Sequence, residues 1–186
     1  MVRDGVAQVK IMKLAERMGV SRSSFYWYFR DRDDLLRALL TEWEARNSAS
    51  IIDQCGLQAA NITEGVCNFF LCFVDPDYFD TGLDFAVREW ARRDEALRCR
   101  VDAADAARLR AVTDMFSRYG FTPEEADARA RILYFMQLGY HALDVREPMG
   151  DRLARVSAYL KGFTGRAPDE PAMVSFMRRV GRLGQP

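Results

Sequence analysis

Residues 9–36, VKIMKLAERMGVSRSSFYWYFRDRDDLL, decide the fold of the N-terminal part of this chain. Apolar residues in the first third recur at helical spacing, and Gly19 follows them where a helix should end. Ser21 is a favourable N-cap for a second short helix, which we expect to end near Phe29. Two short helices joined by a tight turn are typical of a helix-turn-helix, whose second helix lies in the major groove of DNA.

The second short helix has two faces of different character. Phe25 and Phe29 stand four residues apart, so both can pack against the first helix. Arg22, Ser23, Tyr26 and Trp27 then point outward. The aromatic run from Phe25 to Phe29 is too dense for a helix of this length to bury. Exposed aromatic side chains need a partner, and a DNA backbone or a thymine methyl would supply one.

Charge is distributed unevenly along the chain. The 186 residues hold 27 Lys and Arg against 27 Asp and Glu, so the net charge is zero. Residues 1–32 alone hold seven basic and three acidic side chains, a net charge of +4, which leaves −4 for the rest. Zero net charge does not exclude a local basic patch, and the asymmetry places the cationic surface at the N-terminus.

The chain resembles the tetracycline-repressor (TetR) family of bacterial transcription regulators. The residues that carry the resemblance keep the family's spacing: Leu14-Ala15, Gly19-Val20-Ser21, Ser24-Phe25-Tyr26-Trp27-Tyr28-Phe29, Asp31-Arg32 and Leu35. The resemblance implies a double-stranded DNA operator as partner. It also implies contacts to base edges or phosphates from Arg22, Ser23 and Ser24, and to phosphates from Tyr26, Trp27, Tyr28 and Arg32. A structural role stays open for Tyr28 as a core residue and for Arg32 as a solvated charge.

One departure from the family concerns its first helix. The family has a complete helix before this motif, and here only Met1 to Asp4 stand where its last turn should be. Lys10 occupies a position where the family often has a capping Thr. Either the true start lies upstream, or this chain lacks most of the first helix. Without that cover the small N-terminal subdomain would lose buried apolar area. The alternative function is therefore a helical dimer that binds a small molecule or protein and has lost DNA binding.

The remaining sequence predicts an all-α fold of roughly nine helices, without a convincing strand. We expect a helix-turn-helix domain over residues 1–46 and a larger effector-binding and dimerisation domain over 47–186. A helix from Asp33 to about Ile52 joins them. The later helices are expected over 63–74, 78–92, 94–119, 122–145, 150–161 and 172–180.

The helix expected over 122–145 is apolar on more than one face, which predicts burial on more than one face. One face holds Ala126, Ala130, Leu133, Met136, Tyr140 and Leu143; the other holds Ala128, Ile132, Phe135, Gly139 and Ala142. We expect one face in the core and Ile132, Phe135, Gly139 and Ala142 against a second subunit. A central helix inside a monomer is the alternative. The resemblance implies a homodimer that meets through its late helices.

An effector pocket could lie in the same region. Its candidate lining residues are Phe69, Phe70, Phe73, Trp90, Tyr134, Tyr140 and His141, each of which could equally be an ordinary core residue. Aromatic walls with few polar groups suit an apolar or amphipathic small molecule. The resemblance implies a repressor that such a ligand releases from DNA. The helix from Asp33 would transmit the change from the effector pocket to the DNA-binding region.

Other classes of protein find little support in the sequence. The chain has no glycine-rich phosphate loop, no Ser/His/Asp set and only one histidine, His141, so we expect no enzyme and no cofactor. Its four cysteines form no C-x-x-C pair, which predicts buried free thiols and no metal site. The longest apolar runs are far too short for a membrane span, and the N-terminus carries no secretion signal. We therefore expect a cytoplasmic protein.

Overall fold

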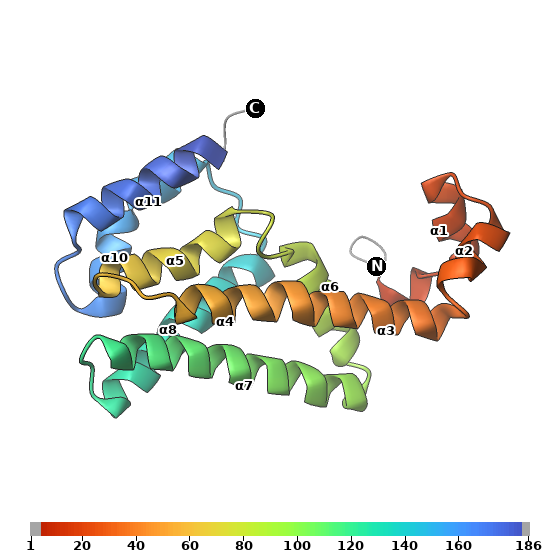
Figure 1. The fold of residues 1–186 in the computed structure, drawn as a ribbon, viewed down its shortest axis with the longest axis horizontal. Helices are drawn as coiled ribbons and strands as arrows, with labels where there is room; N and C mark the ends of the chain where they lie inside the picture. The colour runs from red at the N-terminus through yellow and green to blue at the C-terminus, as the bar shows by residue number, and fades with distance from the viewer. Residues whose placement is uncertain (1–4, 184–186) are drawn as a thin grey trace.

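The computed structural model describes residues 5–183, and all the regular elements in this range are helices, with no strand among them. Helices α1 and α2 form a small lobe, here called the head, at one end of an elongated molecule (Figure 1). The other helices form the body. The elements are η1 (Val6–Gln8), α1 (Ile11–Met18), α2 (Arg22–Tyr28), α3 (Arg32–Trp43), η2 (Glu44–Ser48), α4 (Ala49–Gly56), α5 (Ile62–Val74), α6 (Thr81–Ala91), α7 (Glu95–Arg118), α8 (Pro123–Ala142), α9 (Met149–Ala154), α10 (Val156–Thr164) and α11 (Glu170–Leu183).

Local capping explains the helix boundaries in the head. Gly19 ends α1 in the left-handed conformation, with φ of 65°, which glycine adopts without steric cost. The Ser21 hydroxyl accepts a hydrogen bond from the Ser24 amide at 3.0 Å and so caps α2. The Asp31 carboxylate caps α3 by accepting from the Asp34 amide at 2.7 Å. The boundaries predicted at Gly19 and Ser21 are confirmed, and α3 begins at Arg32, one residue before the expected Asp33, while Lys10 precedes α1 without a side-chain cap.

The expected connecting helix is continuous from Arg32 to Gly56, because α3 passes into α4 through η2, a single π-helical segment. A π-helical turn contains about one residue more than an α-helical turn, because its hydrogen bonds join residues i and i+5. Here the Asn47 side chain donates to the Asp80 carbonyl at 2.9 Å and accepts from the Asp80 amide at 3.0 Å. The head and the body therefore share one helix.

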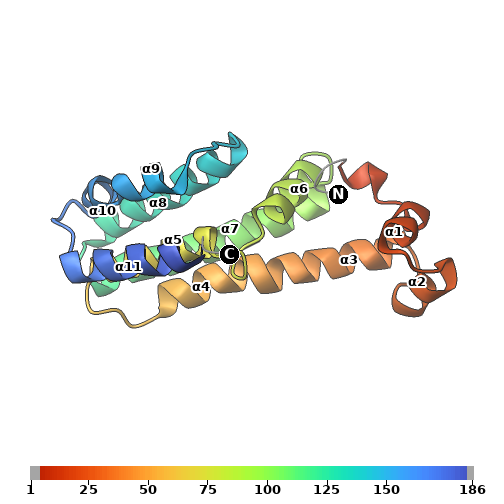
Figure 2. The same ribbon diagram turned by 90° about the horizontal axis from the view of Figure 1, so that it is seen from above.

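Two clusters of buried residues hold the body, and a third holds the head. The largest lies where α4, α5, α7, α8, α10 and α11 meet, with fully buried Phe69, Phe116 and Leu133. A second cluster joins α3, α6 and α7 around Trp43. The head cluster is built on Val9, Phe25, Leu35 and Leu36, and Trp90 of α6 packs against both it and the Trp43 cluster. Figure 2 shows α8, α9 and α10 on the side of the body away from α3 and α4.

Several later helices differ from the expected ranges. The helix expected from residue 78 begins only at Thr81, because the Asp80 carboxylate caps it by accepting from the Leu83 amide. The helix expected to reach residue 145 ends at Ala142. The single helix expected over 150–161 is two, α9 and α10, with Arg155 between them. The last helix is longer than expected, from Glu170 to Leu183.

The four cysteines form no disulfide in the described residues, but not all of them are buried, whereas the sequence predicted that they would be. Cys55, Cys67 and Cys72 lie in the body core, whereas Cys99 is exposed on α7, so that part of the prediction is wrong. Burial raises the pKa of the Cys55 and Cys67 thiols to about 12. Within residues 5–183, no helix is long and apolar enough to span a membrane, and no group of three His, Cys, Asp or Glu side chains could hold a metal ion.

Candidate nucleic-acid interface and ligand cavity

One side of α2 is anchored and the other faces solvent. Phe25 is buried in the head cluster, and its ring lies 5.2 Å from that of Phe29. The outward side, here called the recognition face, consists of Arg22, Ser23, Tyr26, Trp27 and Tyr28. Trp27 is 88% exposed and Tyr28 is 82% exposed, so neither is a core residue. Adjacent aromatic side chains with this exposure favour an interaction surface, because contiguous exposed apolar patches mark such surfaces.

The residues at the start of α2 are arranged around its cap. The Ser21 hydroxyl lies 2.8 Å from the hydroxyls of both Ser23 and Ser24, so these two predicted contact residues also take part in the turn. The Arg22 guanidinium lies over the Tyr26 ring, 5.5 Å from its centroid. This stacking holds a cation beside the exposed aromatic side chains.

Arg32 has a contact that the sequence did not predict. Its guanidinium donates from Nε to the Val9 carbonyl at 2.9 Å and from Nη2 to the Val6 carbonyl at 2.8 Å. Both carbonyls lie in the segment that leads into α1. Arg32 therefore ties this segment to the start of α3, and it is not the solvated charge that the sequence left open.

A buried ionic cluster lies where α3, α6, α7 and α8 meet. It consists of Trp43, Asp84, Arg88, Asp105, Arg108 and Tyr134. Arg108 is fully buried and donates to Asp84 Oδ1 at 3.1 Å and to the Ser48 hydroxyl at 3.1 Å. Arg88 bridges Asp84 at 2.7 Å and Asp105 at 2.6 Å. Burial alone would raise the pKa of Asp84, but the charges of Arg108 and Arg88 outweigh it and lower that pKa below its usual value.

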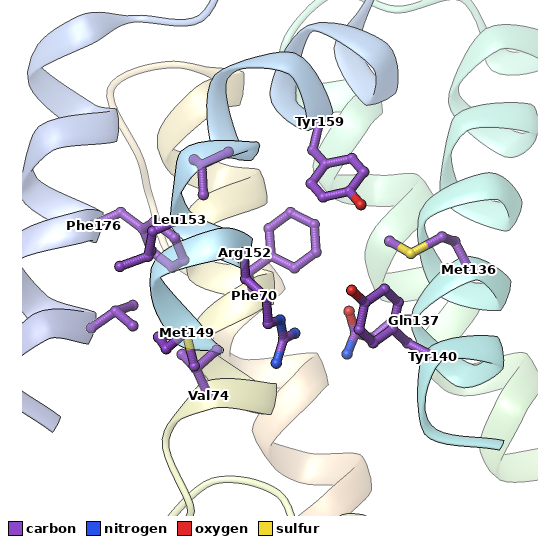
Figure 3. A pocket seen from close by; sticks show the side chains of 12 residues that line it. Phe70, Val74, Met136, Gln137, Tyr140, Met149, Arg152, Leu153, Tyr159 and Phe176 are labelled. Carbon is purple, nitrogen blue, oxygen red and sulfur yellow. The ribbon is translucent and has the colours of Figure 1, made fainter. Parts of the chain in front are cut away.

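A cavity opens between α5, α8, α9, α10 and α11, and we call it the body cavity (Figure 3). The space that the centre of a water molecule can occupy inside it is about 50 Å³. Most of its lining is apolar, and Gln137 and Arg152 supply its strongly polar groups. The lining residues are Phe70, Val74, Met136, Gln137, Tyr140, Met149, Arg152, Leu153, Val156, Tyr159, Phe176 and Val180.

The structure scatters the predicted lining residues. Of these, Phe70 and Tyr140 line the body cavity, while Phe69 is fully buried in the core. Trp90 packs between the head and the body, and the Tyr134 hydroxyl donates to Asp105 at 2.7 Å within the ionic cluster. Phe73 and His141 remain. They lie beside one another, with ring centroids 5.4 Å apart.

His141 connects the body cavity to a second opening. The Gln137 amide nitrogen donates to His141 Nε2 at 2.8 Å, so this nitrogen is unprotonated. Burial lowers the pKa of His141, and the charge of Arg152 lowers it further. The other side of His141 lines an opening of about 160 Å³ between α6 and α8, together with Asp84 and Arg88.

The two predicted faces of α8 separate in the structure. Ala126, Ala130 and Leu133 are fully buried, whereas Ile132 is 59% exposed and Phe135 is 49% exposed. Ala142 is also exposed and Gly139 is half-buried. Leu143 is exposed, contrary to its place on the inward face, because α8 ends one residue before it.

Sequence patterns missed several residues that the fold brings to the cavity. Met149, Arg152 and Tyr159 come from α9 and α10, which return to α8 only through tertiary packing. Their helices are short, and no motif marks them. Gln137 carried the one usable signal, as a polar residue within the apolar stretch of α8.

The head geometry defines a helix-turn-helix protein: a short anchored helix presents Arg22 and three aromatic side chains outward. Residues 1–39 match the model of a family described as bacterial regulatory proteins, tetR family. The N-terminal part of the chain is thus similar to the DNA-binding region of the tetR family, and the match does not extend beyond residue 39. Comparison with curated proteins and with solved structures found no match. The expected loss of the first helix concerns Met1 to Asp4, which lie outside the described residues.

Proposed function

We propose that the chain is a homodimeric repressor that binds its operator through the recognition face and leaves it when a small effector enters the body cavity. The observation that carries this proposal is the recognition face itself. Arg22, Tyr26, Trp27 and Tyr28 are all exposed on one short helix, whose other side is anchored by Phe25. Such a surface supplies both a cation for phosphates and planar groups for base edges.

The proposed roles follow the positions in the head. Arg22, Ser23 and Ser24 lie at the start of α2, where a recognition helix meets base edges and nearby phosphates. Tyr26, Trp27 and Tyr28 contact phosphates, and Tyr26 or Trp27 can also reach a base. Arg32 positions the segment before α1, and a phosphate would have to compete with Asp33, whose Oδ1 lies 3.8 Å from Arg32 Nη1.

Two half-sites on DNA require two heads, and the exposed face of α8 suits a subunit contact. Ile132, Phe135 and Ala142 lie on that face, and the half-buried Gly139 permits close helix approach. Phe85 of α6 is also exposed and borders Gly139 and Ala142. The apolar face thus extends from α8 onto α6.

The proposed domains are residues 1–46 for DNA and 47–186 for effector binding and dimerisation, with the boundary inside the continuous α3–α4 helix. A ligand shifts the protein between states only when it binds one state better. Contacts lead from the body cavity through Gln137 and His141 toward α6, and from Asp84 of α6 to Trp43 of α3. A ligand that moves α8 would therefore change the position of the α3–α4 helix, which carries the head.

The test is a fluorescence-anisotropy titration onto a duplex from the DNA beside the chain's own gene, with a scrambled duplex in parallel. We expect preference for the native duplex. Trp27→Ala should weaken binding at least tenfold, and Arg22→Ala should lower the slope of log affinity against log salt by about one. Arg178→Ala is the matched control, because Arg178 is exposed on α11 in the body, away from the head (Figure 1).

Two results would count against this function. If Trp27→Ala and Arg22→Ala both bind like the unmodified chain, the DNA face is misplaced. If the folded chain binds neither duplex, while dimerising and binding ligand, the alternative of a helical binding protein without DNA binding takes its place.

A further inference from the structure

The cation in the wall of the body cavity points to the chemical class of the effector. Arg152 is the charged residue among the twelve described residues that line the cavity. Its side chain makes no hydrogen bond or ion pair with any residue in the described range 5–183, and its guanidinium lies over the face of the Tyr140 ring, 5.0 Å from the centroid. A half-buried guanidinium that bonds directly to no carboxylate and lies beside a mostly apolar wall favours an anionic ligand group.

The neighbouring arginine shows the contrast. Arg155, three residues later, forms an ion pair with Glu147 at 2.6 Å. The Tyr140 hydroxyl donates to the same carboxylate oxygen. Glu147 is therefore directly bonded to Arg155 and Tyr140, whereas the Arg152 guanidinium acts on it only through space and keeps its N–H donors free for a ligand.

The positions of the polar groups define where a ligand head would lie. Figure 3 shows the Arg152 side chain reaching from α9 toward the wall of α8, where Gln137 and Tyr140 lie. Gln137 is buried and its amide nitrogen is engaged by His141. A carboxylate between these walls would meet the Arg152 guanidinium, which presents paired N–H donors in the geometry that carboxylates accept.

The rest of the cavity limits the body of the ligand. By the measure of ~10–15 Å³ for each water molecule, the cavity holds only about four waters. Phe70, Tyr159 and Phe176 supply aromatic walls, and Met136 and Met149 have flexible side chains that can adjust to a ring. Size and lining together favour a compact, flat, apolar body.

We infer that the effector is a compact aromatic monocarboxylate, held with its carboxylate on Arg152 and its ring among Phe70, Tyr159 and Phe176. This inference rests on the proposed effector function of the body cavity and gives it a ligand class. It explains a cation at this position, which an effector without charge would not need. It also predicts discrimination against cationic aromatic molecules of the same size, because they would meet Arg152 as a like charge.

The test uses three probes of matched shape: benzoate, benzyl alcohol and benzylammonium. Each is titrated calorimetrically into the DNA-free, full-length chain. We expect benzoate to bind at least tenfold more tightly than benzyl alcohol, and benzylammonium to bind most weakly, in keeping with a charge-assisted hydrogen bond. Equal affinity for benzoate and benzyl alcohol, or preference for benzylammonium, would overturn the inference.

Variants place the binding in the cavity. Arg152→Gln should abolish the preference for benzoate over benzyl alcohol, whereas Arg98→Gln, an exposed position on α7 paired with Asp102, should leave it intact. Val156→Trp should fill the cavity and weaken all binding. If benzoate still binds to Val156→Trp as before, it binds elsewhere and the inference fails.

The outcome is separable from that of the proposed function. Calorimetry without DNA reports on the cavity alone, and anisotropy on the operator duplex reports on DNA release. Benzoate that binds through Arg152 without changing DNA affinity would support the ligand class and contradict effector-driven release.

Discussion

The indole Nε1 of Trp43 in α3 donates a 2.7 Å hydrogen bond to Asp84 Oδ1 in α6. Both side chains are buried, and the Arg108 guanidinium lies over the Trp43 ring, 5.0 Å from its centroid, while donating to the same carboxylate oxygen. This contact fixes the helix that carries the head to the body through a charged centre. Its strength depends on every member of the ionic cluster remaining paired.

Removing the Asp84 charge should therefore destabilise the chain strongly. Asp84→Asn leaves Arg108 buried without its closest carboxylate, which costs about 3–5 kcal/mol for a buried pair. Urea denaturation followed by circular dichroism would measure this. Asp102→Asn, in an exposed pair with Arg98, is the control and should cost at most about 1 kcal/mol. Equal effects of the two substitutions would show that the cluster contributes little.

The Asp84 carboxylate should also make the free energy of unfolding depend on pH. The pKa of Asp84 in the folded chain is lowered, so folding favours its charged form. This stabilisation is present above the unfolded pKa of about 3.9 and is lost as the pH falls through the lower folded value. The free energy of unfolding should therefore fall below about pH 4 in the unmodified chain. Asp84→Asn should show a smaller fall over that range, and an unchanged profile would contradict the assignment.

Arg32 should stabilise the head locally. Arg32→Ala removes two charge-assisted hydrogen bonds to the Val6 and Val9 carbonyls, worth about 1.5–3 kcal/mol each at most. We expect faster amide hydrogen exchange in α1, with exchange in α7 unchanged. Arg30→Ala is the matched control, because Arg30 is exposed and pairs only with nearby Asp34 among the described contacts. Uniform exchange changes in head and body would argue against a local role.

The outward face of α8 should control assembly. Ile132→Arg places a charge at an apolar position that is 59% exposed in the single chain, so it should not disturb the core. We expect sedimentation to show a dimer for the unmodified chain and a monomer for this variant. Leu57→Arg, at an exposed leucine after α4, should remain dimeric. A dimer that survives Ile132→Arg would move the interface away from this face.

Thiol reactivity should distinguish the four cysteines. Cys99 is exposed, while burial raises the pKa of Cys55 and Cys67 to about 12 and also raises that of Cys72. A thiol reagent at pH 8 should therefore modify only the Cys99 thiol rapidly in the native chain, and all four thiols in denaturant. Cys99→Ser should eliminate the rapid phase. Rapid modification of a second thiol would show that the body core opens readily.

Much of the head could be predicted because its determinants are local. Gly19, Ser21 and Asp31 set helix ends through bonds to residues within a few positions, and the i, i+4 spacing places Phe25 and Phe29 on one side. The two faces of α8 could be predicted for the same reason, since helical periodicity separates them. Their partners could not, because periodicity says that a face is apolar without saying what covers it.

The site residues in the body show where local reasoning ends. Tyr134 reads as a cavity aromatic, yet its hydroxyl belongs to the ionic cluster, and Trp90 belongs to the joint between head and body. Arg152 looks like one more surface arginine until α9 folds back over α5 and α8. Like the other cysteines, Cys99 belongs to no C-x-x-C pair, and the tertiary structure distinguishes it from them by leaving it exposed.

The amino-acid sequence alone determined the helical class, the helix-turn-helix and the outward Arg22, Tyr26 and Trp27, because capping and periodicity act over a few residues. The tertiary structure alone decided the role of each arginine. Arg108 is buried, Arg32 holds the segment before α1 against α3, and Arg152 faces the body cavity. Arg32 reaches Val9 across 23 positions, and Arg108 reaches Ser48 across 60. Contacts of that separation depend on how whole helices pack, and the burial and charge environment they create gives each arginine its role.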